Sequence, residues 1–152
     1  MSNSPTKWLL AALSCLVVVG AQAAEQQQVR YEPAVVRLSG VVKIEKRYGP
    51  PGFGTSPATD RQVSVPVLTL DAPVTVVGNP PNPRERLTID GDTYRNVTRM
   101  QLVFTTPGTK VGGLDGERAT FTGTLFEKVS GENYTDVLLS VQGVALGTGP
   151  AR

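Results

Sequence analysis

The stretch Val36-Arg37-Leu38-Ser39-Gly40-Val41-Val42-Lys43-Ile44 decides the fold of this chain. Its even-numbered positions are apolar or small, and most of its odd-numbered positions are polar, which is the pattern of a strand with one buried face. Gly40 stands in the middle of the pattern, where a strand coils sharply or takes a bulge. A coiled strand of this kind can serve two sides of a small barrel.

The same alternation recurs along the chain between Gly-rich and Pro-rich segments, and no helical periodicity is long enough to predict a helix. Pro66 indicates a sheet edge or a bulge, and Leu138 indicates that the last strand is buried on both faces. Further strands are expected at 63–70, 74–77, 97–105, 119–125 and 135–146, with a turn at Asp71-Ala72-Pro73.

These strands predict an all-β fold, a small five- to six-stranded OB-like barrel that follows a cleaved signal peptide. The mid-strand glycine favours this fold because the first strand of an OB-fold must curve around the barrel. An immunoglobulin-like sandwich is the alternative, but that fold needs about seven strands and usually a core Trp.

The N-terminal residues have the layout of a secretory signal peptide. Lys7 is the only charge before an apolar run over residues 8–19, and Ala21-Gln22-Ala23 follows it. This layout predicts cleavage after Ala23 and a location in the periplasm or outside the cell. A retained membrane anchor is disfavoured because the run is shorter than the roughly 20 residues that span a bilayer. A lipoprotein signal at Cys15 is disfavoured because the apolar residues continue past it.

The expected organisation therefore has four parts. They are a signal peptide at 1–23, a flexible leader at 24–33, an OB-like β-barrel domain at 34–147 and a loose tail at 148–152. After cleavage, nothing remains that would hold the protein in a membrane.

The composition excludes several classes of function. Cleavage would remove the only Cys and the only Trp, and the chain has no His. We therefore expect no disulfides, no zinc, copper or iron site, no cofactor, and no catalysis that uses a Cys or His. The whole chain has 15 basic and 13 acidic residues, a net charge of +2. This near balance predicts neither nucleic acid nor an anionic membrane as a partner.

Several short motifs resemble those of a family of short exported bacterial domains of unknown function. The resemblance implies an OB-like exported domain and supplies no known activity. Relatives carry a histidine pair or run before the last strand, where this chain has Gly131 to Thr135, so any role of those histidines is absent here. The motifs are Leu38-Ser39-Gly40, the loop from Gly49 to Asp60, Leu68 to Pro73, Gln101-Leu102 and Gly116 to Phe126.

A candidate binding site follows from the predicted fold. OB-folds bind ligands on the face of their second and third strands and through the loops that join strands 1 to 2 and 4 to 5. These loops are expected at Arg47 to Arg61 and at Lys128 to Tyr134, so their aromatic residues would gather at one rim. The alternative is that the aromatics plug the end of the barrel. The predicted ligand-binding residues are Arg47, Tyr48, Phe53, Arg61 and Tyr134.

Two functions are compatible with the sequence. The first is a non-catalytic module of the cell envelope that binds an envelope polymer, either a saccharide or a peptide, or a protein partner. The second is a carboxylate-dependent hydrolase of envelope polymers, which would need two acidic residues across a cleft. A variant of the first is a subunit that completes a larger assembly through an exposed strand edge.

Overall fold

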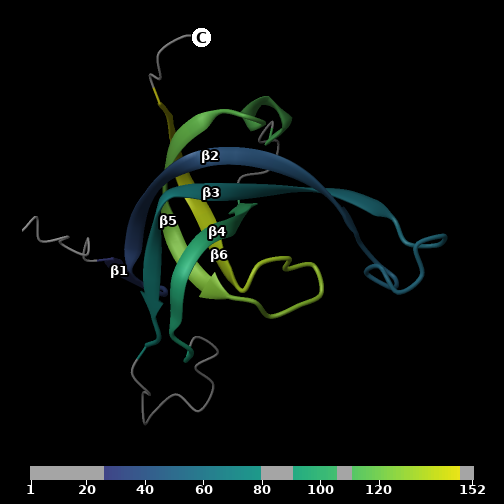
Figure 1. Ribbon diagram of the computed structural model, residues 1–152, viewed down its shortest axis with the longest axis horizontal. Coiled ribbons are helices and arrows are strands. Elements are labelled where there is room, and N and C mark those ends of the chain that lie inside the picture. Colours follow the sequence, from purple (N-terminus) through teal and green to yellow (C-terminus); the bar gives the residue numbers. More distant parts are fainter. Residues whose placement is uncertain (1–25, 80–90, 106–110, 148–152) are drawn as a thin grey trace, which may run out of the picture.

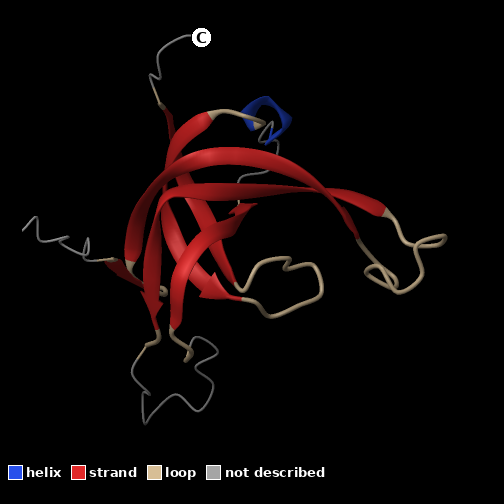
Figure 2. Ribbon diagram, viewed as in Figure 1, coloured by secondary structure: helices blue, strands red, loops and turns tan. Residues whose placement is uncertain are grey.

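The computed structural model describes residues 26–79, 91–105 and 111–147. Within these ranges the secondary structure is almost entirely strand, with one short 3-10 helix (Figures 1 and 2). The predicted signal peptide and the C-terminal tail lie outside the described residues. The elements are β1 (Gln27–Arg30), β2 (Val35–Tyr48), β3 (Gln62–Val77), β4 (Tyr94–Phe104), η1 (Val111–Leu114), β5 (Arg118–Glu127) and β6 (Val137–Leu146).

Five of the strands form a closed barrel. The sheet runs β3-β2-β5-β6-β4, and β4 pairs again with β3, which closes it. Neighbouring strands of the barrel are antiparallel except β4 and β6, which run parallel. β1 is an extra strand that lies parallel to the end of β3. The prediction of a small all-β, OB-like barrel is confirmed. No helix in the described ranges is long and apolar enough to cross a membrane.

The first strand of the barrel, β2, serves two of its sides. Val35–Val41 pairs with β5, and Gly40–Tyr48 pairs with β3. Gly40 belongs to both pairings, and a Cβ added there would lie 2.0 Å from the carbonyl oxygen of Thr69. Only a residue without a Cβ lets the two backbones approach this closely. The glycine in the alternating stretch is therefore required by the curvature of the strand.

Within the barrel, the inward-facing residues of β2 and β3 are even-numbered, at 36–44 of β2 and at 68, 70, 74 and 76 of β3. Leu68 pairs with Val42, and both are fully buried in the core. Phe104 packs edge-to-face against Phe121 with ring centroids 6.5 Å apart, a favourable geometry for two aromatic rings. The largest fully buried side chains are Tyr31, Phe121, Leu68, Met100, Leu125, Leu138 and Leu139.

Part of the outer surface of β3 is covered as well. Val65 and Val67 are 4% and 1% exposed, yet they lie outside the core cluster. They alternate with the core residue Leu68, so their side chains point to the outer face of the sheet. Gln101 of β4 is the register partner of Val67 and lies on the same face. This covered outer face is where the loop between β5 and β6 meets the barrel.

The prediction of a flexible leader at 24–33 is wrong for its described part. Gln27–Arg30 forms β1 against Val74–Val77, and Val29 and Tyr31 are buried. The segment is rich in glutamine and has too few apolar residues to show an alternation, but β3 supplies its backbone with hydrogen-bond partners.

The prediction of a turn at Asp71-Ala72-Pro73 is also wrong. β3 continues without a break through these residues. Asp and Pro favour turns. Here their effect is a shift in the register between β3 and β4, which lies between Thr69 and Val74. A shift of this kind bends the strand without ending it.

Candidate functional site between two loops

The two loops predicted to form the site touch each other. β2 and β3 form a long hairpin that extends beyond the barrel and ends in a loop at 49–61, while the β5–β6 loop covers 128–136 (Figure 1). The Tyr134 hydroxyl donates a hydrogen bond of 2.9 Å to the carbonyl oxygen of Tyr48. The ring of Phe53 lies 3.1 Å from the position of a Cβ added to Gly131. The fold therefore brings Tyr48, Phe53 and Tyr134 together, as the sequence predicts.

The carboxylate of Asp60 organises the β2–β3 loop. It accepts hydrogen bonds from the N–H groups of Gly52 and Gly54, both at 2.7 Å, and of Ser56 at 3.2 Å. Burial alone would raise the pKa of Asp60, but the N–H donors of Gly54, Gly52 and Ser56 hold it below its ordinary value of 3.8. The loop is thus built around an ionised carboxylate.

Phe53 lies between two of these N–H donors and has an unusual backbone conformation. Its φ is 52°, in the left-handed region that costs a residue with a Cβ about 1–2 kcal/mol. The Asp60 hydrogen bonds on either side hold this conformation in place. Phe53 is nevertheless 41% exposed, so the loop leaves part of it open to solvent while its ring contacts Gly131.

Gln101 of β4 holds the β5–β6 loop against the barrel. Its Nε2 donates to the carbonyl oxygen of Glu132 at 3.2 Å, and its Oε1 accepts the N–H of Tyr134 at 2.7 Å. The N–H of Gln101 donates to Thr135 Oγ1 at 2.8 Å. Gln101 is buried, and its polar groups are satisfied by the loop, as buried polar groups generally must be.

A pocket of about 250 Å³ lies between the β2–β3 hairpin and the β5–β6 loop. Its apolar surface comes from prolines and valines, and Tyr134 supplies an aromatic ring. No hydrogen bond or ion pair to another described residue holds the side chain of Glu132, so its carboxylate is available to a ligand. The lining residues are Pro50, Val63, Ser64, Val65, Pro66, Gln101, Glu132 and Tyr134.

The two predicted arginines have contacts within the protein. Arg47 pairs with Glu45, which also pairs with Arg99. Partial burial would raise the pKa of Glu45, but the guanidinium groups of Arg47 and Arg99 hold it below its ordinary value of 4.5. The main chain of Arg61 closes the β2–β3 loop, since its carbonyl oxygen accepts the Gly49 N–H at 2.7 Å. The side chain of Arg61 is exposed.

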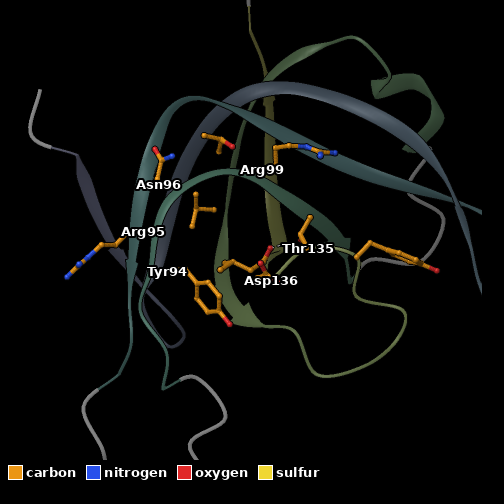
Figure 3. A pocket seen from close by; sticks show the side chains of 10 residues that line it. Tyr94, Arg95, Asn96, Arg99, Thr135 and Asp136 are labelled. Atoms are coloured by element: carbon orange, nitrogen blue, oxygen red, sulfur yellow. Dashed lines mark hydrogen bonds between the residues drawn. The ribbon is translucent and has the colours of Figure 1, made fainter. Parts of the chain in front are cut away.

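Tyr134 also lines a second pocket, of about 330 Å³, between residues 94–99 of β4 and residues 134–137 (Figure 3). The Tyr94 hydroxyl donates to Glu127 Oε1 at 2.6 Å. This hydrogen bond, together with burial and the charge of Glu127, raises the pKa of Tyr94 to about 12. Arg95 points away from the other labelled side chains, and Asp136 is the carboxylate in the wall.

Sequence reasoning missed the walls of the first pocket. Val63 and Val65 are apolar positions in a strand, and only the barrel register shows that they face the loops. No sequence pattern marks Gln101 or Glu132 as a site residue, because only the contacts between the β5–β6 loop and the barrel bring them to the pocket. In the part of the chain that the structure describes, no three acidic, His or Cys residues are placed to hold a metal ion.

Comparison with known proteins identifies no relative of this chain. No protein-family model, no curated protein and no solved structure matches it. The contacts of the site itself therefore carry the argument about its function.

Proposed function

We propose that this protein is an exported, non-catalytic binding module of the cell envelope, whose ligand is a saccharide, a peptide or a protein. The ligand occupies the 250 Å³ pocket between the β2–β3 hairpin and the β5–β6 loop. The observation that carries the proposal is that Tyr134 lines this pocket and bonds to the main chain of Tyr48, while Phe53 contacts Gly131 of the same β5–β6 loop. OB-like barrels use the equivalent pair of loops to bind their ligands.

The exposure of the aromatic residues supports recognition over a structural plug. None of the three belongs to the buried core cluster, and Tyr48 and Phe53 are 39% and 41% exposed. Side chains that plug a barrel would be packed into its core. The unfavourable backbone conformation of Phe53 also supports a role in recognition, because such conformations cluster at functional sites.

Binding is favoured over the alternative of a carboxylate-dependent hydrolase. Glycoside hydrolysis needs a pair of carboxyl groups across one cleft, whereas each pocket has one in its wall, Glu132 in the first and Asp136 in the second. Glu45 lies nearby, but its lowered pKa makes it a poor general acid.

Export is part of the same proposal and depends on residues 1–23. The intact mass of the protein from a periplasmic fraction should correspond to a chain that begins at Ala24. That chain should show no tryptophan fluorescence, since Trp8 is the only tryptophan. A secreted chain that keeps Trp8 would contradict this part of the proposal. Membership of the family that the motifs resemble likewise stays a prediction.

A crosslinking pull-down from envelope extracts tests the binding site. The tagged protein should capture a polymer or a protein, and Phe53→Ala should reduce the amount captured. Val144→Ala is a suitable control, because Val144 is 42% exposed and lies on β6, away from the lining of the pocket. Equal capture by the two variants, or no capture by the wild-type protein, would contradict the proposal.

A further inference from the structure

The outer half of β3 has an unpaired edge next to the pocket. Residues 62–66 pair with β2 on one side, whereas the pairing of β3 with β4 begins only at Val67. Within the described chain, no strand lies along the second edge of Gln62–Pro66. In Figure 1 this is the part of the hairpin that extends beyond the barrel.

The backbone groups that face this open edge follow from the adjacent hydrogen bonds. The Gly49 N–H donates to the carbonyl oxygen of Arg61 at 2.7 Å, so Arg61 faces β2. Successive residues of a strand point their backbone groups to opposite edges, so Val63 and Val65 also face β2. The residues that face the open edge are Gln62, Ser64 and Pro66.

Two observations agree with this assignment. Pro66 has no N–H, and a proline is tolerated in a strand where its nitrogen faces an open edge. The register partner of Pro66 is Ile44, whose N–H donates to Asp115 Oδ1 at 2.8 Å and so faces away from β3. The open edge therefore offers the N–H groups of Gln62 and Ser64, together with carbonyl oxygens.

The pocket adjoins this edge at Ser64 and Pro66. Val63, Ser64, Val65 and Pro66 form one wall, and the β5–β6 loop forms another. A ligand that extends from the pocket along the edge meets the N–H groups of Gln62 and Ser64, which are two residues apart as in a strand pairing. An extended polypeptide matches that spacing and can add to the sheet as a further strand. A saccharide has no such regular series of donors and acceptors.

The side chains around the edge indicate what the peptide carries. Glu132 presents a carboxylate that no other described residue pairs with, and Tyr134 presents a ring in the same wall. Arg47 and Arg99 pair with Glu45, and among the described residues that line the pocket Glu132 is the one with a charged side chain. A Lys or Arg side chain fits this wall, because its stem packs on apolar residues while its charge meets the carboxylate and the aromatic ring.

We propose that the ligand is an extended polypeptide segment that adds as a strand to the open edge of β3 at Gln62–Pro66. The segment places a Lys or Arg side chain beside Glu132. This inference rests on the proposed function, because it names the ligand class of the same pocket.

Selection of peptides from a displayed library of random 12-residue sequences tests the inference, with an array of envelope glycans screened in parallel. The purified protein should enrich peptides that combine β-branched residues with a Lys or Arg at a fixed position. Ser64→Pro removes the N–H from the open edge and should weaken peptide binding by about tenfold or more. Ser64→Ala is the matched control, since both variants lose the hydroxyl that accepts from Lys46 Nζ.

Two further readouts keep the test decisive if Ser64→Pro lowers stability. In the wild-type protein, bound peptide should slow hydrogen exchange of the Ser64 amide, because strand addition places that N–H in a hydrogen bond. Glu132→Gln should remove the preference for Lys or Arg while peptides still bind.

The outcomes separate this inference from the proposed function. Peptides that bind Ser64→Pro and Ser64→Ala equally well, or an unchanged exchange rate at Ser64, would overturn strand addition. A preference for Lys or Arg that survives Glu132→Gln would overturn the role of that carboxylate. Binding of glycans but not peptides would overturn the inference and leave the proposed function intact. If neither a peptide nor a glycan binds, the result would count against both the inference and the proposed function.

Discussion

The hydroxyl of Tyr134 donates a 2.9 Å hydrogen bond to the carbonyl oxygen of Tyr48, a residue 86 positions earlier in the chain. The main-chain N–H of Tyr134 is held at the same time by Gln101 Oε1, at 2.7 Å. Tyr134 is thus fixed from the β2–β3 hairpin and from the barrel wall. These two bonds determine how far the β5–β6 loop stands from β3, and so the width of the pocket between them.

Tyr134→Phe tests this link between the two loops. The variant keeps the ring and loses one hydrogen bond, so the free energy of unfolding should fall by about 0.5–1.5 kcal/mol. Amide hydrogen exchange in the β5–β6 loop should become faster. Tyr48→Phe is the control, because Tyr48 contributes its main-chain carbonyl to this bond. Loop exchange that is equal in the two variants would show that the bond does not hold the loop.

The Asp60 carboxylate predicts a pH dependence of stability. Its folded-state pKa lies below the ordinary value of 3.8, so the ionised form stabilises the native loop above that pH. This contribution is lost as the pH falls through the lower, folded-state pKa. At neutral pH, Asp60→Asn should therefore be less stable than the wild-type protein, and the difference should shrink in acid. Thermal denaturation of both proteins between neutral pH and about pH 3 measures this difference in stability. A difference that stays constant over this range would contradict the lowered pKa of Asp60.

Gly40→Ala tests the curvature of β2. A Cβ at this position would lie 2.0 Å from the Thr69 carbonyl oxygen, whereas no atom of the described residues lies within 4 Å of a Cβ added to Gly112. Gly40→Ala should destabilise the protein by about 1–3 kcal/mol or more, because two backbones must separate. Gly112→Ala should change stability by much less. Chemical denaturation of the two variants should rank them in this order, and the reverse order would refute the close approach.

Phe53→Ala separates recognition from packing. A recognition residue should weaken ligand binding by about 1–3 kcal/mol when its aromatic ring is removed. Because Phe53 lies outside the core cluster, its removal should leave the melting temperature almost unchanged. A large loss of thermal stability with unaltered affinity would instead identify Phe53 as a structural plug.

Alternation in the sequence predicts the strands that have one face in the core. Met100, Leu102 and Phe104 show it in β4, and Phe121 and Leu125 show it in β5. The pattern fails where backbone pairing alone makes a strand. β1 has few apolar residues, yet its pairing with β3 makes it a strand. The middle of β3 contains Asp71 and Pro73, yet the strand runs on through them between residues that are paired on either side.

The candidate site was predictable as far as the fold places its loops. Tyr48, Phe53 and Tyr134 follow from assigning the two loops of an OB-like barrel. Glu132 and the open edge at Ser64 do not, because they depend on where β4 stops pairing with β3 and on how Gln101 holds the loop. These are relations between distant segments, and no local pattern of residue types encodes them.

The most direct test of the central claim is a map of backbone amide chemical-shift changes when the purified protein is titrated with the tightest binder from the peptide or glycan library. The changes should centre on the pocket, at Ser64, Gln101, Glu132 and Tyr134, and extend to Phe53. Thr120, Thr122 and Thr124 of β5, which lie outside the pocket lining, should be unaffected. Changes centred on those threonines, with none at the pocket, would contradict a ligand site between the two loops.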